Sequence, residues 1–213
     1  MAPKQQHVWS SSFGNDYTKR CQRTPQQLDE VYTTLYGSTR SSLNEEFLSK
    51  MSGAVSFLEV GCNIGNQLEL LVKAGIGDLT GMDIQFEALR YAASSGSSLK
   101  LVTAGAPALP FKEGAFDVVF TSGVLIHIPP EHLKSLMMEM LRCSRRYIWG
   151  FEYYAPELTP LSYRGESDML WKGDYATMFL ALPARLRLVA KRMIPYCDVE
   201  VGKSDCMYLL EKY

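Results

Sequence analysis

The sequence predicts an α/β fold in which a seven-stranded, mostly parallel sheet carries helices on both faces and a helical cap precedes the first strand. Three observations predict it. Short apolar runs alternate with segments of helical period, a glycine-containing turn follows the first run, and two runs near the C-terminus can pair antiparallel. The 213 residues suffice for one domain with a sizeable core. We therefore expect one domain over residues 1–213, divided into a cap over 1–53 and a core over 54–213.

The cap is predicted to be helical because it contains two helix start signals. Thr24-Pro25-Gln26-Gln27 combines a capping hydroxyl, a proline at the first helical position and a glutamine three residues after the cap. The apolar residues that follow lie on one helical face: Leu28, Val31, Tyr32, Leu35 and Tyr36. A second start at Ser42 begins another apolar stripe, which reaches Gly53.

An aromatic and charged cluster precedes these helices. It comprises Trp9, Phe13, Gly14, Asp16, Tyr17 and Arg20. The cluster is too rich in aromatic residues for a disordered tail. Tyr17 is the strongest candidate to face a ligand, because Asp16 and Arg20 flank it at positions that would stay polar. A helix that merely packs its aromatic face is the alternative interpretation.

The first strand and its turn organise the rest of the chain. Val55 to Val60 is a short run of branched and aromatic residues, typical of a strand buried on both faces. Gly61 and Gly65 allow a tight turn in which a ligand can approach the backbone. Glu59 lies within the otherwise apolar strand, so its carboxylate requires hydrogen-bond donors.

The other elements follow from the alternation of apolar runs and helical periods. Further strands are expected to end at Asp83 and to cover residues 99–103, 114–121, 145–151, 186–196 and 206–211. Helices are expected after Asp83 and from Pro130, and the second of these has methionines on its apolar face. Residues 161–175 mix aromatic and charged side chains without a clean period, which predicts a functional loop.

The segment from Glu59 to Asn66, Glu-Val-Gly-Cys-Asn-Ile-Gly-Asn, resembles the first motif of class I S-adenosylmethionine-dependent methyltransferases. An acidic residue about 20 positions later, Asp83, can accept hydrogen bonds from both ribose hydroxyls. The resemblance implies S-adenosylmethionine as cofactor, S-adenosylhomocysteine as its product and a Rossmann-like methyltransferase sheet. The implied cofactor-binding residues are Glu59, Gly61, Cys62, Asn63, Gly65, Asn66, Asp83, Ile84, Gly105, Ala106, Ser122, Gly123 and Val124.

One position departs from this family pattern. Many members carry an aspartate that binds the adenine amine where this chain has Gly105. The backbone groups of Gly105 and Ala106 can still contact the edge of the adenine ring. Taken singly, the glycines would be an ordinary turn and Asp83 a helix cap.

Composition bounds the partners. The net charge is −1 and no window is strongly basic, which disfavours nucleic acid as a partner. No apolar run is long enough to cross a membrane and no leader is evident, so we expect a soluble, cytoplasmic protein, monomeric or homodimeric. Five cysteines without short paired spacing argue against a disulfide framework and against a zinc or other metal site.

Several segments together resemble the methylases associated with pseudaminic acid biosynthesis. They are Gly14-Asn15-Asp16-Tyr17 with Arg20, Tyr36-Gly37-Ser38-Thr39-Arg40, Val124 to Ile128, Phe151-Glu152-Tyr153-Tyr154, Tyr163-Arg164-Gly165 and Leu170-Trp171-Lys172. The resemblance implies a small-molecule acceptor, a sialic-acid-like (nonulosonic) sugar or its nucleotide derivative. Gly173 departs from the pattern, where a charged residue would be expected.

The acceptor contacts implied by this resemblance are Arg40, Tyr153, Tyr154, Tyr163, Arg164 and Trp171. An arginine suits a sugar carboxylate because its planar guanidinium makes two parallel charge-assisted hydrogen bonds. Each arginine can instead form a surface ion pair, and Arg40 can equally bind the carboxylate of the cofactor.

His127 is the best-placed general base for a hydroxyl acceptor. His7 lies in the tail and His132 on the polar side of a helix start, whereas His127 follows the fourth strand. Tyr17 is the second catalytic candidate, for orienting the acceptor or facing the sulfonium. Alternatively, His127 only packs and bonds a backbone carbonyl, and an amine acceptor would need no strong base.

Other functions remain open. A nicotinamide oxidoreductase would share the sheet, but its fingerprint requires a third glycine where this chain has Asn66. A non-catalytic module that binds S-adenosylmethionine would need no acceptor pocket. A methyltransferase acting on another small metabolite or a peptide would differ only in its acceptor. Acceptor-dependent turnover separates these alternatives.

Overall fold

The central sheet has the predicted topology. The computed structural model describes residues 4–106, 108–163, 166–197 and 203–213. The seven strands run in the order β3-β2-β1-β4-β5-β9-β8, in which β1 to β5 are parallel and β9 is antiparallel to both of its neighbours. Their bounds are β1 Ser56–Val60, β2 Asp78–Asp83, β3 Lys100–Thr103, β4 Phe116–Ser122, β5 Ser144–Tyr153, β8 Leu186–Pro195 and β9 Ser204–Lys212.

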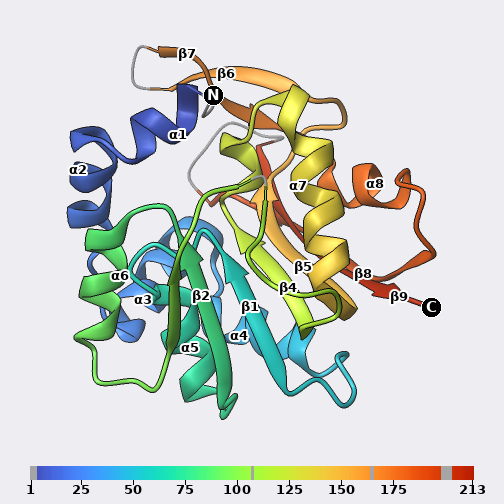
Figure 1. The fold of residues 1–213 in the computed structure, drawn as a ribbon, viewed down its shortest axis with the longest axis horizontal. Helices are drawn as coiled ribbons and strands as arrows, with labels where there is room; N and C mark the ends of the chain where they lie inside the picture. The colour runs from blue at the N-terminus through green and yellow to red at the C-terminus, as the bar shows by residue number, and fades with distance from the viewer. Residues whose placement is uncertain (1–3, 107, 164–165, 198–202) are drawn as a thin grey trace.

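Helices cover both faces of this sheet (Figure 1). They are α1 Lys4–Trp9, α2 Ser12–Cys21, α3 Pro25–Tyr36, α4 Arg40–Leu48, α5 Asn66–Lys73, α6 Phe86–Ala93, α7 Pro130–Cys143 and α8 Tyr175–Leu180, with a 3-10 turn η1 over Leu125–His127. Adjacent residues of a strand point to opposite faces of the sheet: Val118 packs with α4 and α5, whereas Val119 packs with α7 and α8. This alternation is what a strand between two helical layers requires.

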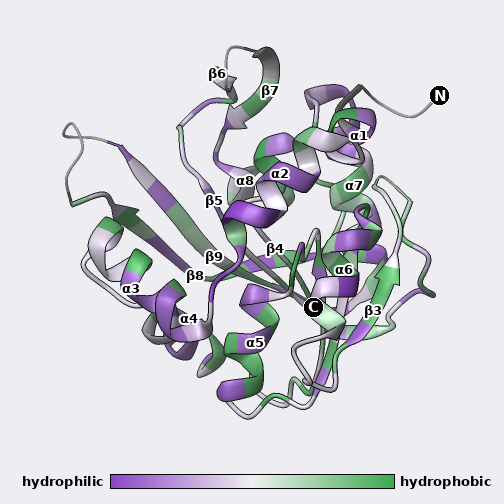
Figure 2. Ribbon diagram, turned by 90° about the vertical axis from the view of Figure 1, so that its left-hand side faces the viewer, coloured by the Kyte–Doolittle hydropathy of each residue, from purple (hydrophilic) through white to green (hydrophobic). Residues whose placement is uncertain are grey.

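The cap is helical, as predicted. The Thr24 hydroxyl accepts the Gln27 N–H at 3.2 Å, and the Gln27 side chain accepts the Thr24 N–H at 2.9 Å. The next helix begins earlier than Ser42, because Thr39 is its N-cap. Figure 2 shows hydrophobic and hydrophilic residues on different sides of α3 and α5, and it places α1 and α2 above them. The cap therefore comprises two layers, of which α1 and α2 lie nearer the carboxyl ends of the parallel strands.

The prediction that residues 161–175 form a functional loop is wrong about their backbone structure. This stretch contains a hairpin of β6 Thr159–Tyr163 and β7 Glu166–Lys172, followed by α8. Met169, Leu170 and Trp171 are all buried in succession, so the strand lacks the alternation by which a one-sided strand is recognised.

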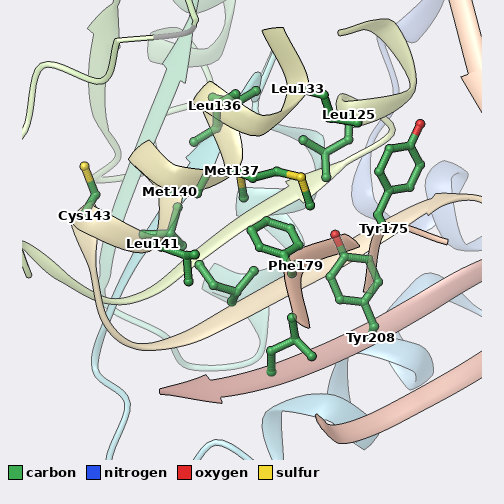
Figure 3. Packing of buried hydrophobic residues seen from close by; sticks show 14 of the residues in the cluster. Leu125, Leu133, Leu136, Met137, Met140, Leu141, Cys143, Tyr175, Phe179 and Tyr208 are labelled. Carbon is green, nitrogen blue, oxygen red and sulfur yellow. The ribbon is translucent and has the colours of Figure 1, made fainter. Parts of the chain in front are cut away.

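The methionines of α7 belong to the core, as expected. Met137 and Met140 are buried against Phe179 of α8 and Tyr208 of β9 (Figure 3). All five cysteines are free thiols. No group of His, Cys, Asp and Glu side chains suited to a metal ion occurs among the described residues. Across those same ranges, none of the helices has the length and apolar character needed to cross a membrane.

Gly150 is required by close packing in the middle of the sheet. It pairs with Thr121 on β4 and with Tyr208 on β9, and the Tyr208 ring lies over it. A Cβ added at Gly150 would be 2.2 Å from Tyr208 Cζ. No real side chain can occupy that space unless the buried tyrosine moves.

We predict that Gly150→Ala lowers the free energy of unfolding by about 1–3 kcal/mol, because overpacking displaces a buried ring. Urea denaturation measures this change. Gly77→Ala is the matched control, since nothing lies within 4 Å of a Cβ at that position. Equal stability of the two variants would contradict the packing described here.

Candidate cofactor and acceptor site

A cavity of about 490 Å³ lies at the carboxyl ends of β1, β2 and β4. This is the edge at which ligands bind in open α/β sheets, and the volume is in the range of small-molecule sites. Its wall includes Glu59, the penultimate residue of β1, together with Asp83 and Ser122, the last residues of β2 and β4. Trp9 of α1 and Tyr17 of α2 line the cavity from the cap. The site therefore lies between the sheet edge and the helical cap.

The turn between β1 and α5 has a left-handed backbone at three positions. Gly61, Asn63 and Gly65 have φ values of 74°, 48° and 78°. Glycine adopts this conformation without strain and asparagine tolerates it better than most residues. The Gly61 and Cys62 N–H groups donate to Met82 O at 2.7 and 3.0 Å, which ties the turn to β2.

Asp83 holds the same turn from the end of β2. Its Oδ2 accepts the Asn63 N–H at 2.8 Å and its Oδ1 accepts the Gln85 N–H at 2.8 Å. Burial raises the pKa of Asp83, although these backbone donors act in the opposite direction. A carboxylate oxygen has more than one acceptor position, so Asp83 can still accept hydrogen bonds from a ligand in the cavity.

Glu59 carries an unsatisfied oxygen on the cavity wall. Its Oε2 is buried and has no hydrogen-bond partner among the described residues. Burial raises the pKa of Glu59 well above its ordinary value, and the charge of Arg40 partly opposes this rise. A buried carboxyl without donors is costly, so this side chain is suited to a cationic or hydrogen-bond-donating ligand group.

Arg40 lies below the cavity. It is 1% exposed, its Nη1 donates to Tyr32 Oη at 3.2 Å and its guanidinium lies 4.3 Å from the centre of the Phe151 ring. Tyr32 lines the cavity, and its hydroxyl accepts from Arg40 while its own proton remains available. Arg40 therefore acts on the cavity through Tyr32.

Gly105 is closely surrounded by the ends of two side chains. A Cβ there would be 3.1 Å from Gln6 Nε2 and 3.2 Å from Ile84 Cδ1. The departure from the family pattern at Gly105 thus goes with the position of Gln6, which α1 brings to this side of the cavity. Both Gly105 and Ala106 line the cavity.

His127 lies at the end of η1 and lines the cavity. Its Nδ1 is 2.9 Å from Met169 O. Because a carbonyl can only accept, Nδ1 carries the proton and Nε2 holds the lone pair in the neutral ring. Burial lowers the pKa of His127 to about 4, and the Trp9 ring packs edge-on against it at 4.7 Å. The ring is therefore neutral near pH 7.

Three hydrogen bonds attach α2 to the floor of the site. The Asn63 amide donates to Thr18 Oγ1 at 2.9 Å, and Thr18 donates to Gln85 Oε1 at 3.0 Å. The Asn66 amide donates to Cys21 O at 2.7 Å. Asn63 and Asn66 therefore join the turn after β1 to the helix above it.

Most residues singled out from the sequence lie together. The cavity is lined by Tyr17, Glu59, Gly61, Cys62, Asn63, Asn66, Asp83, Ile84, Gly105, Ala106, Ser122, Gly123, Val124, His127 and Tyr153. Gly65 is the N-cap residue of α5 and lies outside this lining. Of the described acceptor candidates, Arg40, Tyr154 and Trp171 also lie outside it. Arg164 falls outside the described residues, and for Tyr163 only the backbone is described.

The sequence reasoning missed one wall of the cavity. This wall comes mainly from α3 and comprises Arg23, Leu28, Val31, Tyr32 and Leu35. None of the α3 residues is fully buried, although its apolar residues share a face. The sequence shows an apolar face at these positions. Its pattern is the same whether such a face packs on the core or lines a site.

Comparison with known proteins agrees with this geometry. A family model described as a methyltransferase domain matches residues 57–146. The structure is similar to magnesium protoporphyrin IX methyltransferase from Synechocystis PCC 6803 with bound S-adenosylmethionine, with a TM-score of 0.67, 14% identity and coverage of 100% of this chain and 99% of that one. It is also similar to an S-adenosylmethionine-dependent methyltransferase from Methanosarcina mazei, with a TM-score of 0.62, 19% identity and coverage of 78% and 96%.

Among curated proteins, the tRNA U34 carboxymethyltransferase of Psychromonas ingrahamii is 35% identical over 92 residues. That match covers 39% of this chain and only 28% of the relative. The chain has the class I methyltransferase fold. The match over residues 57–146 supports a methyltransferase domain in this part of the chain.

We predict that His127 makes stability depend on pH in a defined direction. Its folded pKa of about 4 lies below the ordinary value of 6.5, so the unfolded chain binds more protons between these values. Relative to a His127→Gln variant, the free energy of unfolding should rise by up to about 3 kcal/mol as pH increases from 4 to 6.5, and then level off. Denaturant titrations across this range measure the difference, and parallel curves would contradict it.

Proposed function

We propose that the protein transfers a methyl group from S-adenosylmethionine to a hydroxyl or amine of a small molecule. The observation that carries this proposal is the pair of buried carboxyl groups on one cavity wall: Asp83, held by two backbone N–H groups, and Glu59, with an unsatisfied oxygen. The two are candidates for different parts of one ligand. When bound, S-adenosylmethionine would supply an electrophilic methyl group on a positively charged sulfur.

The described residues fit the two ends of this cofactor. Asp83 can accept hydrogen bonds from ribose hydroxyls, and the backbone of Gly105 and Ala106 can contact the adenine edge. At the other end, the unpaired Glu59 oxygen suits an ammonium group. The Tyr32 hydroxyl, supported by Arg40, can donate to a carboxylate. The same part of the cavity therefore offers a carboxyl for the ammonium group of the cofactor and a hydroxyl for its carboxylate.

His127 can accept a proton from an acceptor hydroxyl through Nε2. Its Nδ1 is held by Met169 O, which fixes the ring orientation and the tautomer. The low pKa makes His127 a weak base, because burial penalises its charged form. His127 therefore serves best as a hydrogen-bond acceptor that orients the hydroxyl and takes its proton as the new bond forms. Tyr17 and Tyr153 complete this part of the wall.

We propose a nonulosonic sugar or its nucleotide derivative as the specific acceptor to test first. The support is the sequence resemblance described above. Of the arginines in the described ranges, Arg23 lines the cavity and is exposed, so it is the candidate for the sugar carboxylate, whereas Arg40 is buried. Transfer to tRNA, suggested by the name of the curated relative, is less favoured because the chain has a net charge of −1.

We predict that Glu59→Gln weakens binding of S-adenosylhomocysteine by about ten- to a hundredfold, because a charge-assisted hydrogen bond is lost. Binding of 5′-methylthioadenosine should change little, since it lacks the amino acid group. Calorimetric titration measures both constants. Glu69→Gln is the matched control, because Glu69 of α5 accepts hydrogen bonds from the Ser95 and Ser97 hydroxyls and does not line the cavity. Equal losses for both ligands would contradict the assigned role of Glu59.

We predict that incubation with methyl-labelled S-adenosylmethionine transfers label to at least one free or nucleotide-linked nonulosonic acid. Neutral sugars, small phenols and unmodified tRNA complete the panel, with mass spectrometry as the measurement. His127→Ala should lower turnover by roughly a hundredfold and leave cofactor affinity nearly unchanged. Label only in tRNA would contradict the small-molecule assignment, and absence of cofactor binding would contradict the proposed function itself.

A further inference from the structure

The segment between β4 and α7 supplies a large part of the cavity wall. Its members there are Ser122, Gly123, Val124, His127 and Ile128. The segment contains only a single short turn of helix, η1. Its position therefore depends on the contacts that hold its backbone from behind.

One side chain accepts hydrogen bonds from two backbone N–H groups of the segment between β4 and α7. Glu152 lies near the end of the neighbouring strand β5 and is 1% exposed. Its Oε1 accepts the Val124 N–H at 3.2 Å and its Oε2 accepts the Ile126 N–H at 3.4 Å. Glu152 does not belong to the cavity lining among the described residues. Its carboxylate thus holds the backbone of the wall without lining the cavity itself.

The two anchored residues connect to both halves of the site. The side chain of Val124 lies directly over Gly61, where an added Cβ would be 2.7 Å from Val124 Cγ2. Val124 O also accepts the His127 N–H at 2.9 Å. A shift of Val124 would therefore move the contact surface of the cofactor turn and the ring of His127 together.

We propose that Glu152 is a positioning residue whose ionised carboxylate holds the Val124–His127 turn in the geometry that binds cofactor. A carboxylate can accept both N–H groups at once, one on each oxygen. A protonated Glu152 carries an O–H on one oxygen, so that oxygen is a poorer acceptor. The effect on cofactor binding depends on the proposed function, whereas the holding of the turn does not.

The surroundings of Glu152 favour a change in its protonation near neutral pH. Burial raises the pKa of Glu152 to about 7, while the Thr121 hydroxyl on β4 and the backbone N–H groups of the turn act to lower it. Tyr175 of α8 and Tyr208 of β9 face it, and burial raises the pKa of both. Burial also raises the pKa of Cys206, its partner on β9, to about 12. These three groups stay neutral near pH 7.

Two other groups near Glu152 titrate below it. His127, on the turn itself, has a pKa lowered by burial to about 4. Asp205 on β9 has a pKa raised by burial to about 6, and it accepts hydrogen bonds from Tyr36 and Tyr196. An Asp205→Asn variant therefore separates its contribution from that of Glu152.

The test is calorimetric titration of S-adenosylhomocysteine between pH 5.5 and 8.5. The unsubstituted protein should bind more tightly as pH rises through about 7. Glu152→Gln should bind about tenfold more weakly at pH 8 and match the unsubstituted protein at pH 5.5, because glutamine mimics the protonated acid. Glu157→Gln, on the exposed connection after β5, should follow the unsubstituted protein, and Asp205→Asn should keep the rise near pH 7. An unchanged pH profile in Glu152→Gln would overturn the proposal.

A second measurement does not depend on any variant folding or on ligand binding. In the unsubstituted protein, the NMR amide signals of Val124 and Ile126 should titrate together with one midpoint near pH 7. Signals that remain constant across this range would overturn the proposal. If S-adenosylhomocysteine does not bind while these signals titrate, the proposed function fails and the role of Glu152 stands.

Discussion

The hydrogen bond from the Asn63 backbone N–H to Asp83 is the interaction on which the rest of the site depends. It joins the turn after β1 to the carboxyl end of β2, and the bonds from Gly61 and Cys62 to Met82 O close the same junction. Left-handed backbone at three positions makes this turn specific, because few side chains tolerate it. The side-chain amides of Asn63 and Asn66 then donate hydrogen bonds that hold α2 against this turn. The cap is thus organised by the strand ends that it covers.

The two sides of the cavity are built differently. The side formed by β1 and β2 is fixed by backbone hydrogen bonds within a parallel sheet, so it is stiff and suited to a ligand whose shape does not vary. The side with His127 is held by a carbonyl of the hairpin, by the carboxylate of Glu152 and by the ring of Trp9. Those contacts come from segments that are distant in sequence. The two sides meet at Val124, which packs over Gly61 and whose carbonyl accepts the His127 N–H, so a change on one side reaches the other.

Local patterns predicted the parts of the fold that local physics determines. The strand, turn and helix around Gly61, the acidic end of β2 and the capping box of Thr24 are confirmed because each depends on neighbours in sequence. The β6–β7 hairpin was missed because its burial comes from contacts with η1 and β5, which no periodicity shows. The burial of Arg40 and the cavity-facing side of α3 escaped for the same reason. In a sequence, an arginine beneath a site and an arginine on its wall look alike.

The measurement that tests the central claim most directly is calorimetric titration of S-adenosylhomocysteine into two matched variants of β2. Asp83→Asn removes the charge at the carboxyl end of the strand, beside the cavity, whereas Asp78→Asn removes it at the opposite end, where Asp78 pairs with Lys100. We expect Asp83→Asn to weaken binding by at least about tenfold and Asp78→Asn to leave it within about twofold. Equal binding by both variants, or none by the unsubstituted protein, would contradict the assignment of this cavity to the cofactor.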